Sequence, residues 1–263
     1  MDNYLILPKK LNHENVPFFL LSLLPLHFLT AQSPPISKCP DWSIRGGAGG
    51  IFTNFDNLNS ALGHNYIKPF DENTIFWSIL IKRNPAGKDA GTHIGFRSMQ
   101  ALRETALQYN PDRAVYTNRT LRSDGLIWGY DFYVVNKERF RLFPSLDFEF
   151  NRTVLKIFEE VPVGISLPNA IASNLHTKKF TTWKFMPGVS MHAEYRIPTF
   201  SYYTTIGFDA GYNFDFNSDW KYEDDLPVAF PGFKWSGFQF AFSMGMEIDC
   251  QRLQWYIDKH GRE

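Results

Sequence analysis

Apolar and polar residues alternate with a period of two along most of the chain after residue 41. In segment 236–249 every second residue is large and apolar, and the residues between them are small or polar. Segments 185–197 and 200–215 repeat this pattern. Strict alternation is typical of β-strands with one apolar and one polar face. These runs exceed the roughly five or six residues usual for strands in soluble proteins, and they match the roughly nine to eleven of a membrane-spanning strand.

The alternation predicts eight strands, at 42–53, 74–84, 91–104, 126–135, 140–150, 183–197, 200–215 and 235–250. The connections between them are long and short in turn, without exception. Barrels of the bacterial outer membrane have an even number of strands, with short periplasmic turns and long outer loops. We therefore expect an all-β fold, an eight-stranded antiparallel up-and-down transmembrane β-barrel. It would lie in the bacterial outer membrane with both termini periplasmic.

Tryptophan positions give an independent indication of the same architecture. Four tryptophans fall near the start of the strands that descend from the long loops, namely Trp77, Trp128, Trp183 and Trp235. Indole is apolar in its body and polar at its N–H, and it gathers at membrane–water boundaries. We expect these four side chains to form an aromatic girdle at the outer membrane interface.

The N-terminal residues have the composition of a targeting segment. Residues 16–31 are apolar, follow Lys9 and Lys10, and end at Ala31 before a polar, proline-rich stretch. That order is typical of a secretory signal peptide, and a buried N-terminal helix is the alternative. The expected organisation is a signal peptide (1–31), a periplasmic leader (32–41), the barrel (42–250) and a periplasmic tail (251–263).

Composition excludes several other classes of protein. Lys plus Arg and Asp plus Glu both number 27, so the formal charge is zero, and a nucleic-acid partner, which needs a basic face, is not expected. Aromatic residues make up 17%, too many for a disordered chain. A mean hydropathy of -0.28 with one short apolar run excludes a multi-span helical membrane protein. No His and Cys cluster with zinc spacing and no Gly-rich phosphate loop occurs, so neither metal nor cofactor is expected.

The polar faces of the strands carry charges of both signs. If the apolar faces meet lipid, the lumen receives Arg45, Asp131, Asp147, Glu149, His192, Glu194, Arg196, Asp209, Glu247 and Asp249, together with Lys82, His93 and Arg97. An eight-stranded barrel is just wide enough for side chains to fill it, and buried charges must pair. We therefore expect a structural lumen network of salt bridges and no open pore.

One polar face also carries the residue types of a hydrolase. Ser190, His192 and Glu194 share a face of one predicted strand, and Asp209 lies on the next. A histidine held by a carboxylate can act as general base for a serine. However, residues at i and i+2 on a strand lie about 7 Å apart, too far for a direct hydrogen bond. These four residues are therefore weak catalytic candidates, and no catalytic residue is predicted.

Three segments carry a resemblance to a known group of proteins. They are FTNFDNLNSALG (52–63), DWKY (219–222) and PGFKWSGF (231–238). In these the chain resembles small, mostly uncharacterised outer-membrane β-barrel proteins of Bacteroidota-type bacteria. The resemblance covers most of 42–249 and implies an outer-membrane barrel without assigning catalytic residues. Such chains commonly end on an aromatic residue of the last strand, whereas here residues 251–263 follow it.

Three functions fit these features. The first is an outer-membrane barrel with a structural, adhesive or accessory role through its outer loops. It would contact outer-membrane lipid, and its longest loop, 151–182, is a candidate protein-binding surface. The second is an outer-membrane enzyme that acts on lipid or peptide. The third is a periplasmic, lipocalin-like barrel that binds an apolar ligand inside, because alternation alone does not tell which face points inward.

The two cysteines flank the ends of the predicted barrel. Cys39 lies before the first strand, and Cys250 closes the last. A closed barrel pairs its first and last strands antiparallel, so both residues would meet at the periplasmic rim. Exported thiols meet an oxidising compartment, where a disulfide can persist. We expect a Cys39–Cys250 disulfide across the barrel seam, with two unpaired cysteines as the alternative.

Overall fold

The computed structural model describes residues 41–65, 67–71, 73–84, 89–101, 108–111, 115–160, 176–199, 202–216, 219–223, 226–229, 233–248 and 253. The predicted signal peptide, Cys39, Cys250 and Asp249 lie outside the described residues. So do residues 32–40 of the predicted leader and all of the predicted tail except Leu253. The expectations that concern those segments therefore remain predictions.

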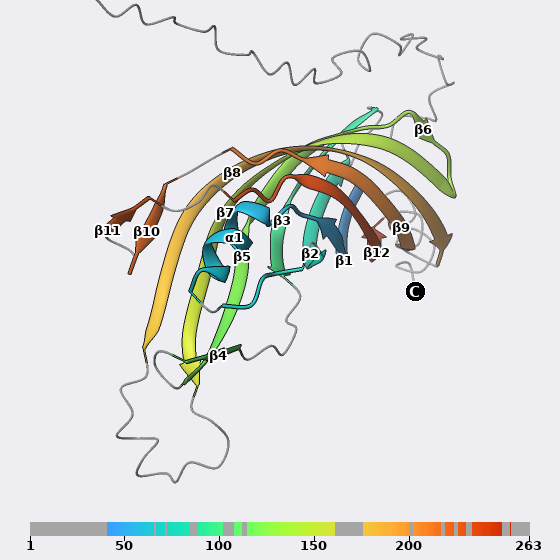
Figure 1. Cartoon of the computed structure of the whole chain (residues 1–263). Helices are drawn as coiled ribbons and strands as arrows, with labels where there is room; N and C mark the ends of the chain where they lie inside the picture. Colours follow the sequence, from blue (N-terminus) through green and yellow to red (C-terminus); the bar gives the residue numbers. More distant parts are fainter. Residues whose placement is uncertain are drawn as a thin grey trace, which may run out of the picture. The chain divides into compact units, whose positions relative to one another are not determined.

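Strands dominate the described part of the chain (Figure 1). In sequence order the elements are β1 (Asp41–Phe52), α1 (Asp56–Gly63), β2 (Asn73–Asn84), β3 (Ala90–Ala101), β4 (Gln108–Asn110), β5 (Val115–Phe132), β6 (Val135–Asn136), β7 (Phe140–Glu160), β8 (Thr177–Pro198), β9 (Tyr202–Asn213), β10 (Trp220–Tyr222), β11 (Leu226–Val228) and β12 (Gly237–Ile248). The described residues contain no helix that is long and apolar enough to cross a membrane.

Eight of these strands form a closed antiparallel ring. Its order is β1, β2, β3, β5, β7, β8, β9 and β12, and β12 pairs with β1 from Ile248 opposite Trp42 to Gln239 opposite Ile51. The short strands β4, β6, β10 and β11 are additions at the two rims. The predicted eight-stranded antiparallel up-and-down barrel is therefore confirmed. Its connections alternate, so we distinguish a long-loop end and a short-turn end.

Three strands are longer than the sequence pattern predicts. Strand β5 begins at Val115 rather than 126, β7 runs to Glu160 rather than 150, and β8 begins at Thr177 rather than 183. The added residues pair with one another from Tyr116 opposite Glu160 to Phe158 opposite Thr177. They reach past the ends of the other strands (Figure 1). The predicted long loops 105–125 and 151–182 are thus partly a wall of sheet at the long-loop end.

The barrel turns its apolar face outward and its polar face inward. On β12, Phe238, Phe242 and Met244 are 69%, 67% and 63% exposed, whereas Gln239 and Glu247 are 7% and 0% exposed. An exterior of large apolar side chains around a polar lumen is the arrangement of a lipid-facing barrel. This orientation contradicts the lipocalin-like alternative, because an apolar ligand in the lumen would require apolar side chains on the inner face.

The long-loop end is filled by an apolar core that we name the apolar cap. Helix α1 places Leu58 and Leu62 in it, and the chain before and after the helix adds Phe55 and Phe70. Asn59 secures the segment, because its side chain accepts the backbone N–H of Phe70 at 2.7 Å and donates to the Phe70 carbonyl at 2.8 Å. The cap rests on the inner faces of the extended strands through Leu121, Leu155, Met186 and their neighbours. The barrel interior therefore has two layers, one apolar and one polar.

One predicted girdle residue belongs to this cap. Trp77, Trp128 and Trp183 are exposed on the outer surface, but Trp235 is fully buried beside Phe55. Its indole N–H donates to Thr153 Oγ1 at 3.1 Å. The prediction for Trp235 is wrong because β12 begins only at Gly237, so strand periodicity does not apply to residue 235, which folds inward over the lumen.

Because the apolar side chains face outward, we predict that a charged substitution on this face destabilises the protein far more than an apolar one. Replacing Phe208, which is exposed on β9, by Arg is expected to reduce the free energy of unfolding in lipid vesicles by roughly 2–4 kcal/mol, since a cation then faces hydrocarbon. Replacing it by Leu is expected to have a much smaller effect. Urea titrations followed by tryptophan fluorescence measure both values. Equal losses in the two variants would show that residue 208 does not face lipid.

Candidate functional site

The polar layer of the lumen contains charged side chains from all eight strands of the ring. At its centre, the Glu194 carboxylate on β8 bonds the guanidinium of Arg45 on β1 and lies 3.3 Å from Lys82 Nζ on β2. The same Lys82 ammonium lies 2.8 Å from Asp131 Oδ2 on β5. All four side chains are buried. Each cation therefore has an anionic partner on another strand, which buried charges require.

His93 connects this group to the next carboxylate. Its Nδ1 lies 3.1 Å from Asp131 Oδ1, and its Nε2 lies 3.0 Å from Asp147 Oδ1. Neutral imidazole has one donor nitrogen, whereas the imidazolium has two. Because both ring nitrogens face carboxylates, this geometry is that of a protonated His93 bridging two aspartates.

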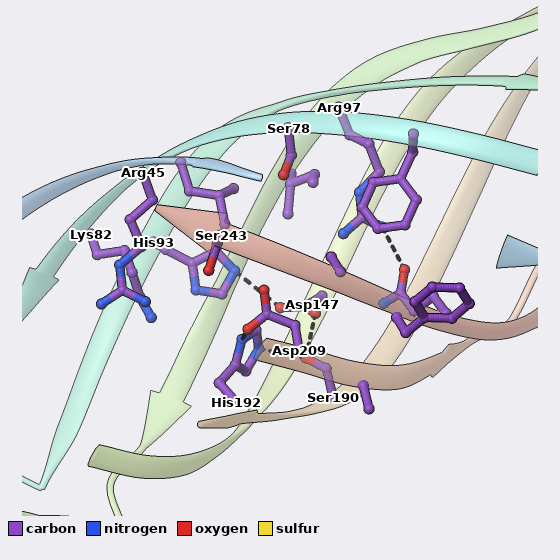
Figure 2. Close-up of a pocket in the computed structure, with 17 residues that line it drawn as sticks. Arg45, Ser78, Lys82, His93, Arg97, Asp147, Ser190, His192, Asp209 and Ser243 are labelled. Atoms are coloured by element: carbon purple, nitrogen blue, oxygen red, sulfur yellow. Dashed lines mark hydrogen bonds and ion pairs between the residues drawn. The ribbon is translucent and has the colours of Figure 1, made fainter. Parts of the chain in front are cut away.

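Ser190, His192 and Asp209 form a hydrogen-bonded chain at the far side of Asp147 (Figure 2). The Ser190 hydroxyl oxygen lies 2.7 Å from His192 Nε2, and His192 Nδ1 bonds the Asp209 carboxylate. The expectation that Ser190 and His192 are too far apart to bond is wrong. The fourth candidate, Glu194, takes no part in the triplet because it bonds Arg45 and Lys82 instead.

Strand register explains why these three residues meet. His192 lies directly opposite Asp209, and Ser190 lies directly opposite Gly211. A Cβ atom at residue 211 would come within 2.7 Å of Ser190 Cβ, so only glycine leaves that space open. Phe143, opposite His192 on β7, stacks on its ring at 4.9 Å. The imidazole therefore leans along the strand toward Ser190 and is fixed there.

The Ser190 hydroxyl has two acceptors within reach and one proton. It lies 2.9 Å from Asp147 Oδ2 as well as 2.7 Å from His192 Nε2. If the hydroxyl donates to Asp147, His192 must donate to the hydroxyl oxygen and carry a positive charge. If it donates to His192, the imidazole is a neutral base, as in a hydrolase. The same atoms therefore allow either an ionic relay or an activated serine.

The space beside the triplet is small. A cavity of about 40 Å³ lies among Ser190, His192, Asp209 and the small residues Ser78 and Ser243 (Figure 2). A volume of that size holds about two or three water molecules.

The remaining charges in the lumen form pairs toward both ends. Near the short-turn end, the Glu247 carboxylate forms ion pairs with the guanidinium groups of Arg141 at 2.6 Å and Arg196 at 3.1 Å. Glu149 bonds Arg97, whose guanidinium also donates to Gln239 at 3.0 Å. Every predicted lumen residue among those described thus faces another lumen charge.

Sequence reasoning missed several interior residues, among them Arg141, Phe143, Lys184 and Asp215. Arg141 and Phe143 have the same parity on β7 as Asp147, and Lys184 has the same parity on β8 as His192, so alternation contained the signal for all three. Asp215 lies beyond the end of β9, and no periodicity identifies it. Its carboxylate accepts a hydrogen bond from the Lys184 ammonium at 2.5 Å under the apolar cap. Among the described residues, no group of three or more His, Cys, Asp or Glu side chains has a metal-binding arrangement.

Fold and interior together define an eight-stranded β-barrel of the transmembrane type with a filled polar lumen. No family model and no curated protein matches the sequence. Among solved structures, the chain is similar to a major outer membrane protein from Thermus thermophilus, with 10% identity, a TM-score of 0.49, and coverage of 80% of this chain and 98% of that one.

The attachment invasion locus protein Ail of Yersinia pestis has 9% identity, a TM-score of 0.36, and coverage of 81% and 99%. The outer membrane protease OmpT from Escherichia coli has 7% identity, a TM-score of 0.31, and coverage of 82% and 99%. With such low identities and TM-scores, these likenesses carry no argument about function. The fold assignment rests on the strand pairings.

The central ion pairs predict a large cost for removing one partner. Replacing Glu194 by Gln leaves Arg45 without its carboxylate in a buried site, and the expected loss in unfolding free energy is about 3–5 kcal/mol. Replacing Arg45 by Met in the same chain should recover much of that loss, because no charge then remains unpaired. Urea denaturation measures both variants. Asp71→Asn, on the exposed surface, is the control, and a loss there as large as for Glu194→Gln would contradict the network.

Proposed function

We propose that this chain is an outer-membrane β-barrel, closed to solutes, with a structural, adhesive or accessory role exercised at its long-loop end. The observation that carries the proposal is the double filling of the lumen. The apolar cap, with Trp235, Phe55 and Leu58 buried, occupies one layer, and the ion pairs around Glu194 and Glu247 occupy the next. A lumen filled in both layers leaves no path for a hydrated solute.

Location in the outer membrane is supported by the surface of the barrel. Exposed apolar side chains cover each strand of the ring, and Trp77, Trp128 and Trp183 stand among them. Closed barrels satisfy every backbone hydrogen bond between their strands, which is what lipid requires. The signal peptide, the periplasmic termini and the Cys39–Cys250 disulfide are parts of the same proposal, as is the resemblance to proteins of Bacteroidota-type bacteria.

The extended strands are the surface available for that role. Strands β5, β7 and β8 carry the sheet beyond the rest of the ring, and β4 and β10 pair with their ends. Residues 161–175, which join β7 to β8, lie outside the described residues. Connecting segments held by a rigid sheet are common sites of recognition. We propose segment 151–182 as the protein-binding surface.

Membrane extraction and electrical recording test this proposal. Cells that express the chain should retain it in the membrane fraction after a carbonate wash. Purified protein inserted in planar lipid bilayers should give no conductance above that of the bare bilayer, because both layers of the lumen are filled. Release by carbonate would overturn the membrane location. Steady unitary currents would overturn the closed lumen.

A second candidate function, hydrolysis of an ester or peptide bond, is favoured by the Ser190–His192–Asp209 geometry. The small cavity beside Ser190 argues against it, since a substrate carbonyl must reach the hydroxyl oxygen. We expect no reaction of the folded protein with a fluorophosphonate probe, read by intact-mass spectrometry. Labelling that disappears in Ser190→Ala but persists in Ser243→Ala, a serine of the same cavity, would establish the enzyme instead.

A further inference from the structure

The centre of the lumen holds more carboxylates than lysine and arginine side chains. We name as the central charge group the charged side chains that line the cavity beside Ser190, together with those bonded to them. Its lysine and arginine members are Arg45, Lys82 and Arg97, and its carboxylate members are Asp131, Asp147, Glu149, Glu194 and Asp209. Five carboxylates therefore face three permanent cations, which leaves an excess of two negative charges.

An excess of negative charge is strongly disfavoured at this depth. Asp131, Glu149 and Glu194 are each 0% exposed, so bulk water does not solvate their carboxylates. A buried charge needs an opposite charge beside it, because the surrounding protein solvates it poorly. Two further positive charges must therefore come from the side chains around the cavity.

The neighbouring ion pairs do not supply these two charges. Toward the short-turn end, Arg141 and a second arginine pair with Glu247, and Arg141 also lies 3.9 Å from Asp41. Under the apolar cap, Lys184 pairs with Asp215. In both places the described cations and carboxylates are equal in number. The remaining groups that can become positive are the two histidines that line the cavity.

His93 supplies one of the two charges. From β3 it reaches Asp131 on β5 with Nδ1 and Asp147 on β7 with Nε2, and Lys82 on β2 lies directly opposite it. A Cβ atom at residue 129 would come within 2.6 Å of the imidazole, so Gly129 leaves the space that the ring occupies. Only the imidazolium has a proton for each of the two carboxylates.

His192 is the source of the other charge. Its Nδ1 bonds the Asp209 carboxylate on β9, and its Nε2 lies 2.7 Å from the Ser190 hydroxyl oxygen (Figure 2). Phe143 on β7 stacks on the ring, and the Ser190 hydroxyl lies 2.9 Å from Asp147 on the same strand as Phe143. A neutral His192 would leave one negative charge unbalanced. An imidazolium at this position brings the central charge group to zero.

We infer that the central charge group binds two protons, one on His93 and one on His192, and that the Ser190–His192 hydrogen bond runs opposite to that of a hydrolase. The imidazolium Nε2–H donates to the Ser190 hydroxyl oxygen, and the hydroxyl donates its proton to Asp147. In a serine hydrolase the hydroxyl donates to a neutral imidazole, which then removes the proton. Ser190 is therefore left without a base. The inference deepens the proposed non-catalytic role and rests on the filled lumen.

Nitrogen NMR of the two histidines tests this arrangement. Protein with isotope-labelled histidine is measured in micelles at about pH 7.5, where histidine in water is mostly neutral. His93 is recognised by its contact with Gly129, and His192 by its contact with Phe143. Both nitrogens of both rings should have the chemical shift and the hydrogen coupling of an N–H nitrogen. A bare nitrogen on His192 would overturn the inference and leave the closed lumen intact, whereas unitary currents would overturn the closed lumen.

Substitution of Asp209 tests the charge count itself. Asp209→Asn removes one negative charge beside His192, so that ring should lose one proton and show a bare nitrogen, while His93 keeps both protons. Asp209→Glu keeps the charge and should keep both protons on His192. Asp215→Asn, outside the central charge group, is the matched control and should leave both histidines unchanged. A His192 signal that is unchanged in Asp209→Asn, or altered as much by Asp215→Asn, would contradict the inference.

Discussion

The pairing of β12 with β1 is the constraint on which the rest of the structure depends. It closes the sheet, so no strand edge of the ring is left to bond another chain or to lose its hydrogen bonds in lipid. Closure of eight strands also fixes a narrow interior. Every side chain that alternation sends inward must fit that space beside its neighbours, and every inward charge must find a partner there.

The barrel interior is filled in two different ways along its length. At the long-loop end the chain uses hydrophobic side chains carried by α1 and by the segment before β12, with Trp235 in their midst. Below them it uses ion pairs that connect strands far apart in sequence, such as Arg45 with Glu194. A charge pair of this kind ties together particular strands, whereas apolar packing tolerates many arrangements. Side chains fill both layers.

The Ser190–His192–Asp209 triplet is connected to the other polar side chains that fill the lumen. Its members continue a relay that runs through Asp147 and His93 to Asp131, and the Ser190 hydroxyl lies 2.9 Å from the Asp147 carboxylate. The need to satisfy polar groups in a narrow lumen is by itself sufficient to produce geometry that resembles a hydrolase. The cavity of about 40 Å³ beside the triplet holds about two or three water molecules.

The sequence by itself determined the eight strands, their order and the side of the sheet to which most side chains belong, because the period of two reports local geometry. It placed Glu194, Asp131 and Arg45 in the lumen for that reason. It did not determine which charges meet, since partners are set by register between strands: Glu194 bonds Arg45 and not Arg196.

Only the tertiary structure decided the positions that lie outside strand periodicity. Trp235 points inward, and the Asp215 carboxylate forms an ion pair with Lys184. Trp235 and Asp215 both lie between β9 and β12, outside the strands themselves. The contact between Ser190 and His192 likewise depends on Gly211, a neighbour across the sheet rather than along the chain. Alternation reports which way a residue points from its own strand, and it contains no information about what another strand places in front of it.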